Sequence, residues 1–327
     1  MDYVKNTLLN SSSADLAVKM ENFAAKFSGT IRQNAPMSEY TSWRIGGAAD
    51  WLLEPASFDD VIMVLDFAQT NNVPLTIIGR GTNLLVSDNG IAGLVLRIGE
   101  ALSQVDIWQE GEEYLVKAQC GALLAALSRQ TAEAGLSGLE WACGIPGNLG
   151  GALMMNAGAY GSSIGEYVTE VEAVAYNDSE NRKAVLQTLQ GSALRFGYRS
   201  GCLAQDMVAL SVTLRLQSGE REAACKRIGE ILTSRRQNQP LEYPSAGSVF
   251  RNPENSHAGY LIEQAGCKGL TYGGAQVSEK HGNFIINLGG ATAADVLQLI
   301  EQVRTIVAEK SGYVLETEVR LLGRKAE

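Results

Sequence analysis

Residues 75–83 read Leu-Thr-Ile-Ile-Gly-Arg-Gly-Thr-Asn, a short apolar run that leads directly into a loop with two glycines. A run of this length and composition is typical of a buried strand. A helix is predicted just before it, because Ser57-Phe-Asp-Asp60 is a helix start signal and is followed by apolar residues at helical spacing until Pro74. Helix, strand and glycine loop in this order form one α/β unit. The chain is therefore predicted to mix helices and strands.

Similar patterns extend on both sides of this unit. The expected helices cover residues 14–27, 123–134, 220–236 and 259–265, and a long amphipathic helix begins at the cap Thr292-Ala-Ala-Asp295. The expected strands cover residues 94–98, 114–118, 168–176, 207–216, 274–277, 283–287 and 314–321. We expect an α+β fold with an N-terminal extension (1–35), a two-lobed domain (36–218, lobes of about 36–100 and 101–218) and a smaller α/β domain (219–327).

Composition limits the functions that the chain can have. The 327 residues include 27 Lys and Arg against 36 Asp and Glu, so the net charge is −9 and a general nucleic-acid surface is not expected. With only two histidines, His257 and His281, a histidine-based metal site or Ser-His-Asp triad is not expected, and we predict no metal. The sequence shows no membrane span and no signal peptide, and its five dispersed cysteines are typical of reduced, buried thiols. We expect a cytoplasmic protein without membrane insertion or an obligate protein partner.

Two glycine-rich segments could hold a phosphate-bearing cofactor. Residues 79–83 follow a strand and can turn consecutive backbone N–H groups inward as an anion nest. Residues 145–158 carry glycines just before a short apolar helix, whose N-terminal amides can face a negative group. Neither segment matches the P-loop or the Rossmann fingerprint. The alternative, that these glycines only form turns and allow close helix packing, stays open on the residues alone.

Longer motifs are more specific. In chain order they are Thr41-Ser-Trp-Arg-Ile-Gly-Gly-Ala-Ala-Asp50, Gly79-Arg-Gly-Thr-Asn83, Gly138-Leu-Glu-Trp-Ala-Cys-Gly-Ile-Pro-Gly147, Gly150-Gly-Ala-Leu-Met-Met-Asn-Ala-Gly-Ala-Tyr-Gly161, Phe196-Gly-Tyr-Arg-Ser200, Gln239-Pro-Leu-Glu-Tyr-Pro-Ser-Ala-Gly-Ser-Val-Phe250, Gly273-Gly-Ala-Gln-Val-Ser-Glu-Lys-His281 and Leu315-Glu-Thr-Glu-Val-Arg320. On these motifs, which cover about residues 41–322, the chain closely resembles the UDP-N-acetylenolpyruvoylglucosamine reductase (MurB) family of peptidoglycan precursor synthesis.

The resemblance implies a FAD-binding domain of the vanillyl-alcohol oxidase (PCMH) type, followed by a substrate domain peculiar to these reductases. It implies that NADPH passes a hydride to non-covalently bound FAD, and that UDP-N-acetylglucosamine-enolpyruvate is then reduced to UDP-N-acetylmuramate. The FAD contacts that it implies are Gly79, Arg80, Gly81, Thr82, Asn83, Leu84, Gly144, Ile145, Pro146, Gly147, Gly150, Gly151, Asn156, Ala157 and Gly158.

Three residues fall on the family's catalytic positions. The resemblance implies that Ser248 donates a proton, that Arg199 holds the substrate carboxylate and the developing enolate, and that Glu318 neutralises or orients the enolate. From the residues alone, Ser248 is more simply a turn residue that bonds to the backbone, and a surface or strand-end position is the default for Arg199. Glu316 is an equal candidate by pattern, since side chains two apart on a strand share a face. Only the match to the family's closing motif selects Glu318.

The resemblance is looser for the substrate groove. It implies substrate contacts from Tyr160, Arg236, Asn252, Lys280 and His281, and Arg320 could reach the cofactor. It also implies the family's class without a tyrosine-bearing loop over the substrate. Only residues 217–234 separate the strand that ends at Leu216 from Arg235, and one helix would use nearly all of them.

Two other functions compete with the reductase. The first is an oxidase of the broader flavin family, many of which tether the flavin through a histidine of the FAD domain. Both histidines of this chain lie beyond residue 250, which argues against such a tether. The second is a binding module that has lost catalysis. The joint presence of Arg199, Ser248 and Glu318 argues against that alternative, because a binder does not need a proton donor.

Overall fold

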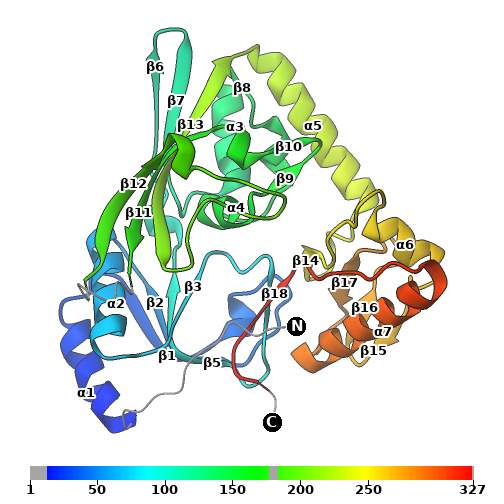
Figure 1. The fold of residues 1–327 in the computed structure, drawn as a ribbon, viewed down its shortest axis with the longest axis horizontal. Helices are drawn as coiled ribbons and strands as arrows, with labels where there is room; N and C mark the ends of the chain where they lie inside the picture. The colour runs from blue at the N-terminus through cyan, green and yellow to red at the C-terminus, as the bar shows by residue number, and fades with distance from the viewer. Residues whose placement is uncertain (1–12, 177–182, 326–327) are drawn as a thin grey trace.

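The computed structural model describes residues 13–176 and 183–325, which form three parts: two lobes and a C-terminal domain (Figure 1). The first lobe contains α1 (Ser13–Ala24), β1 (Thr30–Pro36), η1 (Met37–Glu39), β2 (Ala48–Glu54), α2 (Phe58–Thr70), β3 (Leu75–Ile78), β4 (Leu84–Val86), β5 (Ile91–Arg97) and η2 (Glu100–Leu102). Its sheet has the order β1-β2-β5-β3, in which β2, β5 and β3 are parallel and β1 is antiparallel. Residues 30–35, expected to belong to an extension, thus form most of an edge strand.

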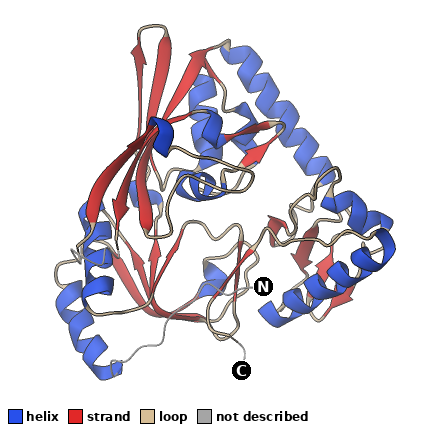
Figure 2. Ribbon diagram, viewed as in Figure 1, coloured by secondary structure: helices blue, strands red, loops and turns tan. Residues whose placement is uncertain are grey.

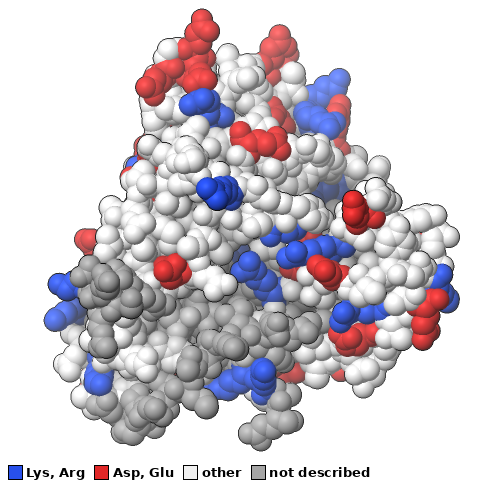
Figure 3. Space-filling model, in the orientation of Figure 1, with Lys and Arg blue, Asp and Glu red and all other residues white. Residues whose placement is uncertain are grey.

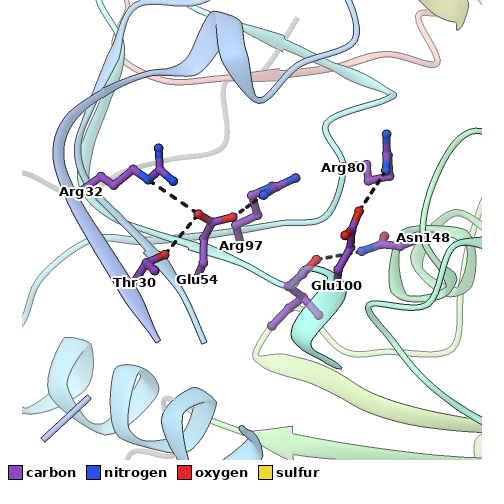
Figure 4. A network of polar contacts seen from close by, with 8 residues as sticks. Thr30, Arg32, Glu54, Arg80, Arg97, Glu100 and Asn148 are labelled. Carbon is purple, nitrogen blue, oxygen red and sulfur yellow. Dashed lines mark hydrogen bonds and ion pairs between the residues drawn. The ribbon is translucent and has the colours of Figure 1, made fainter. Parts of the chain in front are cut away.

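Polar contacts hold this first sheet at its edge. The carboxylate of Glu54 on β2 accepts from Oγ1 of Thr30 at 3.3 Å and lies 3.8 Å from Nε of Arg32, both on β1. It also pairs with Arg97 at the end of β5 (Figure 4). One carboxylate therefore joins three strands, while Ser57 caps α2 by accepting from the N–H of Asp60 at 3.1 Å.

The second lobe is built on an antiparallel sheet with the order β12-β11-β13-β7-β6, and its helices lie on one side of that sheet (Figure 2). Its elements are β6 (Val105–Glu110), β7 (Glu113–Gln119), α3 (Leu124–Glu133), β8 (Leu136–Ser137), η3 (Glu140–Gly144), α4 (Leu149–Met155), β9 (Gly158–Ala159), β10 (Ser162–Ser163), η4 (Ile164–Glu166), β11 (Val168–Ala175), β12 (Val185–Gln190), η5 (Gly191–Ala193) and β13 (Met207–Ser218). The long helix α5 (Arg221–Asn238) follows β13 after two residues. This helix occupies the stretch in which a relative with the tyrosine-bearing loop over the substrate would need that loop.

The C-terminal domain has a small antiparallel sheet with the order β14-β17-β16-β15. Its elements are β14 (Ser245–Ser248), α6 (Ala258–Gln264), β15 (Thr271–Tyr272), β16 (Ala275–Val277), β17 (Phe284–Asn287), α7 (Ala293–Ser311) and β18 (Arg320–Leu322). β18 leaves this domain and pairs in parallel with β4 of the first lobe. The chain end therefore ties the C-terminal domain to the first glycine loop.

Apolar cores fix how the three parts meet. One core is shared by the two lobes and includes Leu53 and Val64 from the first and Val116 and Leu214 from the second. A second core fills the C-terminal domain and takes in Trp43 of the first lobe, whose indole N–H donates to the carbonyl of Ile285 at 2.7 Å. The face of α5 that carries Ala224, Ile228 and Ile231 packs on α3 and η3 of the second lobe. The boundary expected at residue 219 stays a prediction, and the helix that begins there is anchored in the second lobe.

The helices, the closing strand and the cysteines differ in how well they match the predictions from the sequence. The helices expected near 14–27, 123–134, 220–236 and 259–265 are present with small shifts at their ends. The expected closing strand over 314–321 is wrong in extent, because only Arg320–Leu322 pair as a strand and Thr317 forms an isolated bridge with Phe250. Of the five free cysteines, three are buried as expected, whereas Cys202 is half-buried and Cys225 is exposed.

Within residues 13–176 and 183–325, no helix has the length and apolar character needed to cross a membrane. The same residues contain no cluster of three or more His, Cys, Asp and Glu side chains that could hold a metal ion.

Candidate active site

The first glycine loop, residues 79–83, connects β3 to β4 and leaves no room for side chains at two positions. Gly81 has a φ of +67°, and a Cβ there would lie 2.1 Å from the carbonyl oxygen of Tyr40. A Cβ on Gly79 would lie 2.3 Å from Oδ1 of Asn148. The loop therefore packs against the backbone at Tyr40, after η1, and against the second glycine segment, a close approach that only glycine allows.

Asn148 fixes the position of the second glycine segment. Its Oδ1 accepts from the N–H of Gly151 at 3.2 Å and caps α4, while its Nδ2 donates to the carbonyl oxygen of Ile98 at 2.9 Å (Figure 4). A Cβ on Gly147 would lie 3.3 Å from Oγ1 of Thr82 in the first loop. The two glycine segments therefore face one another across the junction of the lobes.

The groups at this junction suit a phosphate-bearing cofactor. The N–H of Ser42 donates to the carbonyl of Gly81 at 3.2 Å, while Oγ of Ser42 is buried and makes no hydrogen bond within the described residues. A buried hydroxyl without a partner costs about 1–3 kcal/mol, so a polar group bound beside it would be stabilising. Arg80 lies 3.8 Å from the carboxylate of Glu100 (Figure 4). The first loop thus carries a cation, Arg80, and the hydroxyl of Ser42 lies beside it.

An ion pair joins the second lobe to the C-terminal domain. Nε of Arg199 lies 2.8 Å from Oε1 of Glu318, and the two side chains are only 20% and 14% exposed. Nε of Arg199 is nevertheless without a well-aligned acceptor among the described residues, so the contact is an ion pair rather than a directed hydrogen bond. The guanidinium carbon also lies 5.3 Å from the ring centre of Tyr198, within cation–π range.

Tyr198 makes a second link between the same two parts. Its hydroxyl accepts from the backbone N–H of Asn252 at 3.3 Å. Tyr198 and Arg199 are neighbours in one turn of the second lobe, and both contact the C-terminal domain. The turn thus presents an aromatic ring and a cation to the junction.

Ser248 is the last residue of β14 and precedes a backbone contact with Glu318. Gly247 before it has a φ of +74°, and the carbonyl of Val249 after it accepts from the N–H of Glu318 at 2.8 Å. The backbone that carries Ser248 therefore runs directly alongside the backbone that carries Glu318. The three residues expected to be catalytic come from segments that the fold brings together.

Glu316 and Glu318 differ in their surroundings. Glu316 is exposed, whereas Glu318 is mostly buried against Arg199. The segment 316–318 lies outside β18, so the argument that both side chains share a strand face does not apply. Nδ2 of Asn83 donates to the carbonyl of Glu318 at 3.0 Å, which anchors this segment to the first glycine loop.

The residues expected to contact the substrate are spread over different surroundings. Tyr160 is 49% exposed with a φ of +55°, and Oδ1 of Asn252 accepts from the N–H of Ala258 at 3.0 Å. Nζ of Lys280 donates to the carbonyl of Arg236 at 2.7 Å, and thus holds the end of α5.

His281 has a structural contact of its own. Its Nδ1 accepts from the N–H of Asn283 at 3.2 Å, and burial, aided by nearby Lys268, lowers the pKa of its imidazole below the ordinary 6.5. Because an accepting nitrogen must be unprotonated, the bond and the lowered pKa agree. The imidazole therefore supports the loop before β17.

Arg235, which was not among the expected substrate contacts, lies deeper than Arg236. A Cβ on Gly144 would lie 2.3 Å from Cδ of Arg235, so this side chain packs on the end of η3, just before the second glycine segment. Burial lowers the pKa of Arg235, and the nearby phenol of Tyr160 acts in the opposite direction. Arg236 is exposed. In Figure 3, Lys and Arg side chains gather at this junction of the second lobe and the C-terminal domain.

Helical spacing could have distinguished the two arginines. Ile228 and Ile231 are buried on one face of α5, and Arg235 follows them at positions i+7 and i+4 of that face. Arg236 is turned one residue further round the helix. The periodicity of α5 therefore carries a signal for Arg235.

Asn156, expected at the cofactor, uses its side chain within the chain. Its Oδ1 accepts from the N–H of Gly165 at 3.0 Å, and its Nδ2 donates to the carbonyl of Gly197 at 3.0 Å. Any contact from this residue to a cofactor would therefore come from its backbone.

Comparisons with known proteins agree on both halves of the chain. Residues 49–182 match the family model of the FAD binding domain, and residues 239–322 match that of the UDP-N-acetylenolpyruvoylglucosamine reductase, C-terminal domain. UDP-N-acetylenolpyruvoylglucosamine reductases from Moorella thermoacetica and Heliobacterium modesticaldum are 45% and 43% identical, over 90% and 93% of this chain and 93% and 94% of theirs. The crystal structure of the enzyme from Thermus caldophilus, 32% identical, superposes with a TM-score of 0.74 over 90% of this chain and 98% of its own.

A FAD-binding domain of the vanillyl-alcohol oxidase type, followed by a small domain that brings an acidic side chain to a buried arginine, defines a flavin-dependent oxidoreductase. The fold class and the cofactor expected from the sequence are confirmed. At more than 40% identity over nine-tenths of the chain, the protein belongs to the UDP-N-acetylenolpyruvoylglucosamine reductase (MurB) family.

Proposed function

We infer that this chain uses NADPH and FAD to reduce the enol ether of UDP-N-acetylglucosamine-enolpyruvate to the lactyl ether of UDP-N-acetylmuramate, in peptidoglycan precursor synthesis. The relatives named above carry the name of this activity, and this chain spans more than 90% of their length. The observation that carries the proposal is the Arg199–Glu318 pair, 2.8 Å between nitrogen and oxygen, at the junction of the FAD-binding and C-terminal parts. The arginine of this pair can bind the substrate carboxylate and stabilise negative charge that develops next to it.

The facing glycine segments are proposed to hold FAD, because their backbone N–H groups and the unpartnered hydroxyl of Ser42 suit its pyrophosphate. When bound, FAD accepts a hydride from NADPH and supplies it to the terminal carbon of the enolpyruvyl group. Both histidines lie beyond residue 250, which supports non-covalent binding. The backbone N–H of Arg320 donates to the carbonyl of Asn83 at 3.0 Å, so Arg320 lies next to the first glycine loop. Its side chain is proposed to face the cofactor.

Arg199 is proposed to grip the substrate carboxylate. Its Nε is engaged with Glu318, and the two terminal nitrogens at the other end of the guanidinium match a carboxylate fork. When hydride reaches the terminal carbon of the substrate, negative charge develops over the neighbouring carbon and the carboxylate. A fixed, mostly buried cation stabilises that charge more than water would.

Glu318 is proposed to orient Arg199 and to balance the charge around the enolate. Its backbone is fixed from two sides, by Val249 and by Asn83, so the carboxylate has little freedom to move away. Ser248 is proposed to deliver the proton to the carbon next to the carboxylate. A neutral hydroxyl is a weak acid in water, but it can protonate a strongly basic enolate beside it in a site that excludes water.

The UDP part of the substrate is proposed to lie over the basic junction. Arg235 is the stronger candidate for the diphosphate, because it packs against Gly144, next to the second glycine segment, and lies near Tyr160, whereas Arg236 is exposed. Asn252 is bonded to Tyr198 through its backbone and lies at the same junction.

An anaerobic assay with the purified flavoprotein tests the proposal. NADPH should bleach the visible flavin band, UDP-N-acetylglucosamine-enolpyruvate should restore it, and the product should be two mass units heavier than the substrate. Restoration by oxygen alone, with no change in mass of the UDP-sugar, would favour an oxidase. A band that NADPH does not bleach would favour a binding module.

A further inference from the structure

The turn that carries Arg199 is short and closed at both ends. Gly197 and Ser200 exchange two backbone hydrogen bonds, from the N–H of Gly197 at 2.9 Å and from the N–H of Ser200 at 3.1 Å. Only Tyr198 and Arg199 lie between them. Arg199 has a φ of +54°, a left-handed conformation that costs a residue with a side chain about 1–2 kcal/mol. Such a conformation persists only where the surroundings enforce it.

The C-terminal end of α4 supplies the enforcing contacts. Asn156, itself left-handed with a φ of +41°, donates from Nδ2 to the carbonyl of Gly197 at 3.0 Å. One residue beyond the turn, the N–H of Gly201 donates to the carbonyl of Met154 at 3.1 Å. Both sides of the turn are thus bonded to the last residues of one helix.

The other end of the Asn156 amide is fixed as well. Its Oδ1 accepts from the N–H of Gly165 at 3.0 Å, and a Cβ on Gly165 would lie only 2.5 Å from Cγ of Phe196 and 2.9 Å from that Oδ1. The amide is held between two backbone segments and has a single way to point. Its donor side faces the turn.

We propose that Asn156 is a positioning residue for Arg199: its amide fixes the Gly197–Ser200 turn, so that the guanidinium is aligned with both Glu318 and the substrate carboxylate. The inference rests on the proposed function, because it concerns the arginine that acts on the substrate. Displacing a positioned group by about 1 Å can cost about 10² in rate. Loss of the Asn156 donor should therefore slow the step that uses Arg199 and leave the cofactor cradle intact.

The experiment compares Asn156→Asp with Asn72→Asp. The first substitution would keep an acceptor for the N–H of Gly165 but place a second acceptor against the carbonyl of Gly197. Asn72 is the matched control, since it is exposed and shares the left-handed backbone, with a φ of +52°. With Asn156→Asp we expect normal FAD content, normal bleaching by NADPH and about 10–100-fold slower reoxidation by the enolpyruvyl substrate. Asn72→Asp should match the unmodified protein in all three.

Two further variants decide how the effect arises. Asn156→Gly keeps the left-handed backbone and removes both side-chain bonds, so it should slow reoxidation in the same way. In an Arg199→Ala background, Asn156→Asp should add nothing, because the group through which it acts is gone. Additive slowing, or loss of FAD from both Asn156 variants, would overturn the proposal. If Arg199→Ala alone leaves reoxidation unchanged, the role of Arg199 in the proposed function fails instead.

Discussion

Replacing Glu318 by Gln should slow substrate reduction by about 10²–10³-fold. The Arg199–Glu318 contact is 2.8 Å between side chains that are 20% and 14% exposed. At that distance and an effective dielectric constant of about 20, the attraction is about 6 kcal/mol before desolvation. Removing one partner of a buried pair typically costs about 3–5 kcal/mol. About 3–4 kcal/mol acting in the transition state corresponds to the expected loss in rate.

The assay is stopped-flow absorbance at the flavin band, with steady-state kinetics beside it. Because Glu318 is proposed to orient the arginine that stabilises charge developing during the reaction, kcat and kcat/KM should fall together. Glu316→Gln is the matched control: its side chain is exposed, and its turnover should be near normal with a stability change within about ±0.5 kcal/mol. An inactive Glu316 variant beside an active Glu318 variant would instead place Glu316 in the site and contradict the role of Glu318.

Other substitutions test the cradle, the substrate contacts and the pH response. Gly81→Ala should lower FAD occupancy, since its Cβ would lie 2.1 Å from a backbone oxygen. Gly111→Ala is the control, because Gly111 has a φ of +62° and open space around it, so the substitution should cost only backbone strain. The flavin content per protein distinguishes the two outcomes. Arg235→Ala should raise KM for the UDP substrate at least tenfold and Arg236→Ala should leave it nearly unchanged, as steady-state titrations would reveal. Burial lowers the pKa of His281 in the folded protein below its ordinary value of 6.5. The unfolded chain therefore takes up a proton at a higher pH than the folded protein, and the folded state loses stability as the pH falls from 6.5 through the lower folded pKa. The free energy of unfolding should therefore decrease on acidification below about pH 6.5, and His281→Gln should flatten that decrease in denaturant titrations.

Local signals were enough for the elements near the first glycine loop. Residues 75–78 form a strand and residues 79–83 form its loop, because the apolar run and the glycines act within a few residues. The same holds for α7, where Thr292 and Asp295 form the capping box that the sequence shows. Periodicity and capping are local, so they can be read from the chain itself.

Contacts between distant residues were harder to predict. The closing strand is shorter than expected because the residues before Arg320 do not join a sheet. Thr317 forms an isolated bridge with Phe250, just beyond β14, and the carbonyl of Glu318 accepts from Asn83. The difference between Glu316 and Glu318 depends on Arg199, more than a hundred residues away, and the use of the Asn156 amide depends on Gly197, on a separate segment. No pattern along the strand can contain that information. The choice of Arg236 over Arg235 is different, since the helical phase of α5 was available in the sequence.

The chain itself is proposed to supply the proton in the second half-reaction, and Ser248→Ala removes the hydroxyl that would deliver it. Each half-reaction is followed separately by anaerobic stopped-flow at the flavin band. Bleaching by NADPH should keep its rate, because hydride arrival needs no proton from this hydroxyl. Reoxidation by the enolpyruvyl substrate should slow by about 10⁴-fold or more, at or above the top of the range usual for a general acid. Equal slowing of both half-reactions, or unchanged reoxidation, would contradict this role of Ser248.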